Sequence, residues 1–148
     1  MKRIISFLIV AIFAVVINGV DVKAETPYHN KWNIYLTPIE IELLSRTVQL
    51  EAGNEIKESK YATIETILNR IISNKYPNTL IEVLSQKGQF STWKHVTTPK
   101  ATPTFDTYQC VATVLVGQTN VLNYDNLHFN NRPIDNNPIK IGNQYYGK

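Results

Sequence analysis

Three acidic residues, Glu51, Glu55 and Glu58, lie close together where an apolar helical pattern runs into a glycine. Glu51 has apolar residues before it and a loop, beginning at Gly53, after it. Such surroundings raise the pKa of a carboxyl group and keep it protonated near neutral pH, as a general acid for glycosidic bonds requires. The alternative is an exposed helix end with ordinary surface acids, and this segment alone does not decide between the two.

The number of carboxyl groups that face the substrate separates two glycosidic chemistries. A standard glycosidase needs two carboxyl groups that face the sugar. A lytic transglycosylase needs only one, because the C6 hydroxyl of the substrate is the nucleophile. The glycine break leaves the spacing of Glu55 and Glu58 from Glu51 unfixed by any one helix. We therefore treat Glu55 and Glu58 as possible supporting acids.

Other catalytic chemistries have weaker support. The three histidines, His29, His95 and His128, form no HExxH-type pair, and there is no cysteine cluster, so we expect no metal and no cofactor. No phosphate loop, dinucleotide fingerprint or G-x-S-x-G elbow is present. The single cysteine, Cys110, lies in an apolar run and is expected to be a buried small hydrophobe and not a nucleophile.

The N-terminus has the pattern of a secretory signal peptide. Lys2 and Arg3 precede an apolar run over residues 4–20, and small residues permit cleavage after Ala24. The alternative is an uncleaved membrane anchor. Cleavage lowers the net charge from +3 to +1, because three basic residues and one acidic residue leave with the peptide. We expect a secreted or periplasmic protein, without a membrane span in the mature chain and without the basic block that nucleic-acid binding needs.

The rest of the chain predicts one α+β domain that is mostly α-helical. Residues 25–36 read as an extended lead-in, and residues 37–148 as the domain itself. Thr37, Pro38 and Glu40 form a capping box at the first helix start, and Gly53-Asn54 is expected to end that helix in a left-handed conformation. We predict four helices, over residues 37–52, 58–73, 80–84 and 105–116. A small C-terminal β-hairpin is predicted from two strands, over residues 126–130 and 139–146.

The second predicted helix has one apolar side, and the segment after the third helix mixes polar and aromatic residues. Tyr61, Ile64, Leu68 and the isoleucines 71 and 72 form one apolar stripe, which places Glu65 and Arg70 on other sides. Residues 86–103 are predicted to be irregular, and they interleave polar groups with aromatic rings, a composition that suits sugar binding.

Six short motifs occur in order along the chain. They are Glu51-Ala52-Gly53-Asn54-Glu55 with Glu58, Leu68-Asn69-Arg70, Tyr76-Pro77-Asn78-Thr79, Gln86-Lys87-Gly88-Gln89-Phe90-Ser91, Leu127-His128-Phe129-Asn130 and Ile141-Gly142-Asn143-Gln144-Tyr145-Tyr146. In these motifs the chain resembles the SleB-like cell-wall hydrolases, the family of spore cortex-lytic enzymes and related phage and bacterial proteins. It departs from that pattern at Asn54, at Gln144, where a histidine is common, and in lacking a late-loop tryptophan.

The resemblance implies a reduced lysozyme-like domain that cleaves the linkage between N-acetylmuramic acid and N-acetylglucosamine in peptidoglycan. The catalytic glutamate of the family then corresponds to Glu51. With one clear acid, we expect a lytic transglycosylase. The alternatives are a muramidase that uses water and a non-catalytic cell-wall binding protein on the same scaffold.

The same reading assigns the substrate contacts. We expect a monomer that binds peptidoglycan glycan strands. Candidates to orient the sugar are Gln89, Ser91, His128 and Asn130, and candidate stacking surfaces are Phe90 and Tyr145.

Overall fold

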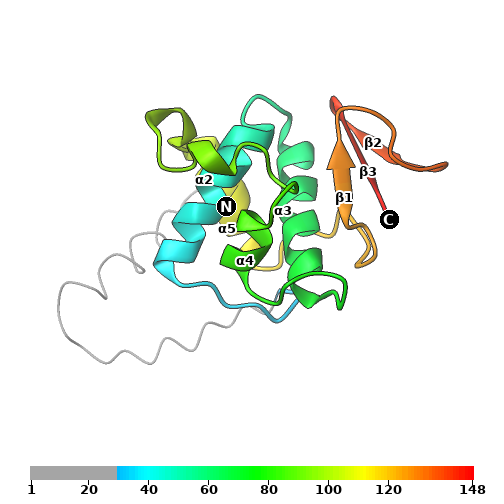
Figure 1. Ribbon diagram of the computed structural model, residues 1–148, viewed down its shortest axis with the longest axis horizontal. Coiled ribbons are helices and arrows are strands. Elements are labelled where there is room, and N and C mark those ends of the chain that lie inside the picture. The colour runs from blue at the N-terminus through cyan, green and yellow to red at the C-terminus, as the bar shows by residue number, and fades with distance from the viewer. Residues whose placement is uncertain (1–29) are drawn as a thin grey trace.

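The computed structural model describes residues 30–148 (Figure 1). The predicted signal peptide, its cleavage site and residues 25–29 lie outside this range. Within it, no helix is both long enough and apolar enough to cross a membrane. The elements are α2 (Pro38–Ala52), α3 (Lys57–Ile72), α4 (Leu80–Ser85), η1 (Trp93–His95), η2 (Pro99–Ala101), α5 (Phe105–Leu115), β1 (His128–Asn130), β2 (Ile139–Ile141) and β3 (Gln144–Gly147).

Helix α2 begins as the sequence predicts but ends differently. Thr37 and Glu40 form the capping box, with the Thr37 amide donating to Glu40 Oε2 over 2.8 Å. The expected left-handed ending is wrong, because Gly53 has φ −56° and ψ −34° and its amide still donates to the Gln49 carbonyl. A Cβ at Gly53 would overlap both the backbone carbonyl oxygen and the side chain of Gln49. The glycine is therefore needed for space and not for a positive φ.

Helix α3 occupies the centre of the domain. It packs against α2, α4 and α5, and it also contacts the strands β1 and β2 (Figure 1). It is buried on nearly all sides, so the expectation that Glu65 and Arg70 point away from the buried stripe is wrong. Both are almost fully buried, whereas Ile72, placed on the stripe, is 45% exposed.

The C-terminal part is a three-stranded antiparallel sheet and not the two-stranded hairpin predicted. The strand order is β1-β3-β2, and Tyr146 pairs with both Phe129 and Ile139. The run predicted as one strand, residues 139–146, is divided by a tight turn at Gly142, which has φ +60°. A β-branched or bulky residue would be strained there, so glycine places the turn. The prediction of four helices is confirmed, because α2, α3, α4 and α5 correspond to the four predicted ranges.

A buried carboxylate, Glu65, fastens two distant segments to α3. Its side chain is fully buried and forms an ion pair with Lys31 at 3.0 Å. It also accepts hydrogen bonds from the Thr119 hydroxyl at 2.7 Å and from the amides of Val121 and Leu122. These partners satisfy a buried charge that would otherwise be strongly destabilising.

We predict that Glu65→Gln lowers the free energy of unfolding by about 3 kcal/mol. The amide removes the negative charge beside Lys31 and sets an N–H group against donors. Urea unfolding followed by circular dichroism measures the change. Glu58→Gln, at an exposed position on the same helix, serves as the control and is expected to change the value by less than about 0.5 kcal/mol. A loss at Glu65 no larger than the control's would contradict this role.

Candidate active site

Glu51 lies in the last turn of α2 and is held at both its side chain and its backbone. Thr92, in the segment between Phe90 and η1, donates a short hydrogen bond from its hydroxyl to Glu51 Oε1. The Glu51 carbonyl accepts a hydrogen bond from Gln144 Nε2 at 2.9 Å. The side chain is half-buried. One carboxyl group is thus fixed where α2, the loop before η1 and strand β3 meet.

The surroundings of Glu51 suit a proton donor. Burial raises the pKa of its carboxyl group above the ordinary value, and the Thr92 hydrogen bond and the positive charge of Arg70 oppose that shift in part. Desolvation disfavours the ionised form, whereas a hydrogen-bond donor and a cation favour it. The net direction agrees with the sequence-based expectation that the pKa of Glu51 is raised.

Arg70 brings a buried positive charge into this region. Its Nε donates to the Leu127 carbonyl at 2.7 Å, and its guanidinium carbon lies 5.0 Å and 5.2 Å from the ring centroids of Tyr76 and Phe90. Within residues 30–148, its Nη1 atom has no hydrogen-bond partner. Burial lowers the pKa of the guanidinium, but an arginine stays charged at physiological pH.

Gln144 connects Glu51 to a buried hydrogen-bond network on α3. While its Nε2 holds the Glu51 carbonyl, its Oε1 lies 2.8 Å from the Tyr146 hydroxyl and 3.3 Å from Thr63 Oγ1. Tyr146 in turn lies within hydrogen-bond distance of Ser59 and Thr63. Partners on both sides of the amide define its orientation and fix the end of α2 against the sheet.

The two possible supporting acids, Glu55 and Glu58, engage other parts of the domain than Glu51. Both oxygens of Glu55 accept hydrogen bonds from Asn143, at 3.0 Å from its amide and 3.3 Å from its side chain. Glu55 therefore stabilises the turn between β2 and β3. Glu58 is exposed in the first turn of α3, and its charge acts on Tyr61 and Cys110, on the α5 side of the helix.

The segment 86–92 contributes exposed polar groups, but its aromatic ring is not open to solvent. Gln89 and Ser91 are exposed on either side of Phe90. Phe90 itself is 5% exposed and packs against Phe129, with ring centroids 6.1 Å apart. The expectation that Phe90 offers a stacking face is therefore wrong, since the ring belongs to the core.

The sheet separates the other expected substrate contacts from Glu51. Side chains alternate between faces along a strand, and paired residues share a face. Phe129 and Tyr146 pair and contact one another on the side facing α3. Asn130 and its partner Tyr145 consequently lie on the opposite face, where Lys140 covers the Tyr145 ring. His128 is exposed at the start of β1, and its pKa is lowered by partial burial and by the charges of Arg70 and Lys75.

Sequence reasoning missed three contributors: Thr92, Arg70 and Gln144. Thr92 is the neighbour of the candidate Ser91, and only the fold shows which of the two hydroxyl groups reaches Glu51. Arg70 belongs to one of the six motifs, but the apolar stripe places it on the wrong side of its helix. Gln144 stands out in the sequence only as a departure from the family pattern.

Cys110 and the possible metal ligands complete the inventory. Cys110 is buried as predicted, and burial together with the nearby Asp106 raises the pKa of its thiol to about 11. A thiol with that pKa stays protonated and is a poor nucleophile at neutral pH. Across residues 30–148, no three His, Cys, Asp or Glu side chains gather in a way that could hold a metal ion.

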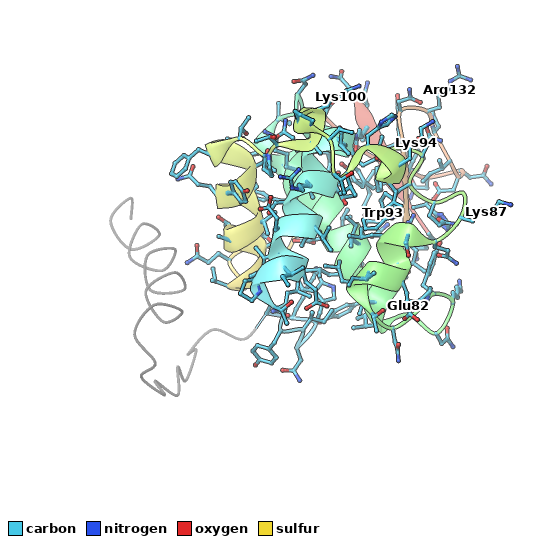
Figure 2. The ribbon with its side chains drawn as sticks, turned by 60° about the vertical axis from the view of Figure 1, so that its left-hand side comes forward. Glu82, Lys87, Trp93, Lys94, Lys100 and Arg132 are labelled. Carbon is cyan, nitrogen blue, oxygen red and sulfur yellow. The ribbon has the colours of Figure 1, made fainter. Side chains whose placement is uncertain are left out.

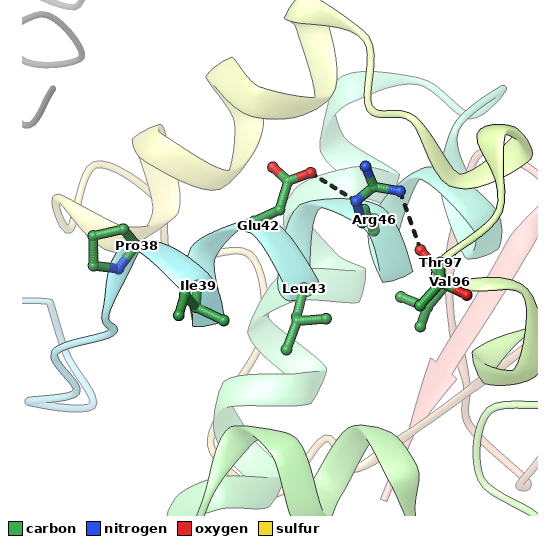
Figure 3. A pocket seen from close by; sticks show the side chains of 7 residues that line it. All are labelled: Pro38, Ile39, Glu42, Leu43, Arg46, Val96 and Thr97. Atoms are coloured by element: carbon green, nitrogen blue, oxygen red, sulfur yellow. Dashed lines mark hydrogen bonds and ion pairs between the residues drawn. The ribbon is translucent and has the colours of Figure 1, made fainter.

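An open groove of about 470 Å³ lies along the other part of α2 (Figure 3). Its only carboxylate, Glu42, forms an ion pair with Arg46 at 2.6 Å and accepts a hydrogen bond from Tyr108. Glu51 does not line this groove, and the Glu42 carboxylate is already engaged by Arg46 and Tyr108. We therefore place the candidate chemistry at the C-terminal end of α2.

Comparison with known proteins decides the family. A family model described as Cell Wall Hydrolase matches residues 54–146, well over half of the chain. The chain belongs to the cell-wall hydrolase family. The resemblance noted in the sequence is thereby confirmed, and membership makes this protein a peptidoglycan-degrading enzyme. The matched range begins just after Glu51, so the case for that residue comes from its motif and its geometry.

Two solved structures share the fold of this cell-wall hydrolase. One is the catalytic domain of the germination-specific lytic transglycosylase SleB from Bacillus anthracis, with 21% identity, a TM-score of 0.62, and coverage of 76% of this chain and 97% of that one. The other is the catalytic domain of the Bacillus cereus SleB protein, with 20% identity, a TM-score of 0.62, and coverage of 77% and 93%. A search of curated proteins found no match.

The hydrogen bond from Thr92 gives a prediction for the pH profile of this cell-wall hydrolase. Thr92→Val removes a donor that lowers the pKa of Glu51, so the pKa is expected to rise further. If Glu51 is the acid, its protonated form then persists to higher pH. The alkaline limb in a plot of kcat/KM against pH is therefore expected to shift to higher pH. Thr97→Val, at an exposed position in the same segment, is expected to leave the limb unchanged. A limb that stays in place or moves to lower pH in Thr92→Val would contradict the assignment.

Proposed function

We propose that this enzyme cleaves the linkage between N-acetylmuramic acid and N-acetylglucosamine as a lytic transglycosylase, with Glu51 as its catalytic carboxyl group. The observation that carries the proposal is one half-buried acid with a raised pKa whose charged neighbour, within residues 30–148, is a cation and not a second carboxylate. The name of one structural neighbour, a lytic transglycosylase, agrees with this reading.

The proposed reaction uses the same carboxyl group twice. Glu51 first donates its proton to the glycosidic oxygen as the bond from that oxygen to the muramic acid C1 breaks. The resulting carboxylate is favoured by the Thr92 hydroxyl and by the charge of Arg70. It then accepts the proton of the C6 hydroxyl, while that oxygen bonds to C1. The products are a 1,6-anhydro-muramic acid end and a free hydroxyl on the departing sugar, and Glu51 is protonated again.

The side chains proposed to contact the substrate beside Glu51 are those that are exposed to solvent. Gln89 and Ser91 flank the segment that supplies Thr92, and they offer hydrogen-bonding groups to sugar hydroxyls. His128 is a third candidate, near the charge of Arg70. Asn130 and Tyr145, on the outer face of the sheet, would meet only parts of a glycan strand that pass beyond its edge.

We propose that the enzyme works outside the cytoplasm after cleavage behind Ala24. The support is the N-terminal sequence pattern together with a family whose substrate is the cell wall. The first residue of the exported protein tests the cleavage site, and it should be Glu25.

Replacement of the proposed acid is expected to abolish most of the activity. Glu51→Gln keeps the shape and the hydrogen bond to Thr92 but removes the proton donor, so turnover of purified sacculi should fall by about 10²–10⁴-fold. Glu55→Gln and Glu58→Gln are the matched controls, because one acid holds a turn and the other is exposed. Full activity in Glu51→Gln together with loss in either control would overturn the site assignment.

Product masses test the transglycosylase mechanism separately. Attack by the substrate's own hydroxyl gains the advantage of an intramolecular reaction, so muropeptides should end in 1,6-anhydro-muramic acid. Each would then be one water lighter than a hydrolysis product in mass spectrometry of digested sacculi. Reducing-end muramic acid as the main product would instead support a muramidase that uses water, and would reopen the search for a second carboxylate.

A further inference from the structure

We propose that three lysines beside the active site, Lys87, Lys94 and Lys100, bind the free carboxylates of the peptides on peptidoglycan strands. The inference rests on the proposed function and adds to it a substrate class: glycan strands that still carry their peptides. We call residues 86–101 the basic segment.

The basic segment reaches the catalytic centre directly. Thr92, near its middle, donates the hydrogen bond to Glu51. Lys94 follows two residues later in η1, and Lys100 lies in η2. The segment carries three lysines and a histidine but no acidic residue. Its charge therefore has one sign next to the group proposed to perform the chemistry.

The lysines of the basic segment have no acidic partners. Of the twelve Lys and Arg side chains in residues 30–148, five form ion pairs with acids, and none of these five is in the segment. Lys87, Lys94 and Lys100 are all exposed, and no hydrogen bond within the described chain engages them. Lysines elsewhere, such as Lys60 with Asp106 at 2.6 Å, are used for structure.

The three lysines are all visible in one view of the domain. In Figure 2 Lys100 is labelled at the top, Lys94 below it to the right, and Lys87 at the right-hand edge, with the half-buried Trp93 nearer the middle. Arg132, from the loop after β1, is labelled at the upper right of the same view; it is exposed and forms no ion pair within residues 30–148. Because Thr92 of the same segment contacts Glu51, a strand bound at Glu51 would pass close to these unpaired cations.

The chemistry of the substrate explains what these cations would bind. The sugar rings of peptidoglycan are uncharged, whereas every second sugar bears a short peptide with free carboxylates. Exposed lysines gain little from neutral hydroxyl groups, but several together attract a polyanion, with an attraction that salt screens. The described chain carries twelve basic and ten acidic residues, so this is a local feature and not the result of a highly basic protein.

The test removes the lysine charges and the substrate carboxylates separately. The lysine charges are removed in a triple variant, Lys87→Gln with Lys94→Gln and Lys100→Gln. The carboxylates are neutralised by coupling ethanolamine to purified sacculi that are free of teichoic acid, with mock-treated sacculi as reference. A second triple variant, Lys57→Gln with Lys75→Gln and Lys148→Gln, removes the same charge elsewhere.

On mock-treated sacculi we expect the basic-segment variant to lose about 5- to 50-fold in kcat/KM, since exposed pairs contribute modestly and their effects combine. The loss should fall mainly on KM, because the lysines bind substrate without acting in the reaction. Wild type on neutralised sacculi should show a similar loss, and the variant on neutralised sacculi should lose no more than about twofold further. The control triple variant should behave as wild type on both substrates.

A binding measurement separates this proposal from the proposed function. Glu51→Gln is mixed with sacculi and pelleted at increasing salt, with and without the three lysine changes. Weaker, less salt-dependent binding in the lysine variant supports carboxylate recognition even if the wild type cleaves nothing, a result that would refute only the proposed function. Independent losses from the two neutralisations, or wild-type binding by the lysine variant, would overturn the proposal. An effect seen only on walls that retain teichoic acid would also overturn it, in favour of a phosphate polymer.

Discussion

The fold depends on the requirement that polar groups buried along α3 find partners. Glu65 accepts hydrogen bonds from the 119–122 segment, and Asn69 donates to the carbonyls of Asn123 and Asn126 at 2.8 Å and 3.0 Å. Arg70 donates to the Leu127 carbonyl. The connection from α5 to β1 has no regular structure, so its buried backbone groups rely on these side chains. The polar side chains of α3 therefore hold the irregular connection over residues 116–127 in place.

The same helix positions the candidate acid from two directions. Toward its N-terminus, Ser59 and Thr63 hold the Tyr146 hydroxyl, and Gln144 passes this constraint to the Glu51 backbone. Farther along, Arg70 places a buried charge that opposes part of the desolvation of Glu51. Burial thus raises the pKa of the carboxyl group while Thr92 and Arg70 still favour its ionised form. The proposed mechanism needs that balance, because in it the group both gives and takes a proton.

Neighbouring acids in one short motif have different roles. Glu51 is half-buried and engages a hydroxyl group, whereas Glu55 accepts two hydrogen bonds from Asn143 and supports the turn at Gly142. A Cβ at Gly142 would lie 2.6 Å from Glu55 Oε2, so the glycine and the glutamate fit one another closely. The short motif therefore contains both the candidate acid, Glu51, and the residue that stabilises the neighbouring turn of the sheet, Glu55.

The sequence by itself determined the helices, the capping box at the start of α2, the candidate acid and the family, because these depend on local periodicity and on residues close together in the chain. The tertiary structure decided what distant segments do to one another. It buried Phe90, turned Asn130 and Tyr145 to the far face of the sheet, and brought Thr92 to Glu51. It also divided the last strand at a glycine whose positive φ is not visible in hydrophobic patterning. Such outcomes depend on long-range contacts, and a pattern read along the chain carries no information on them.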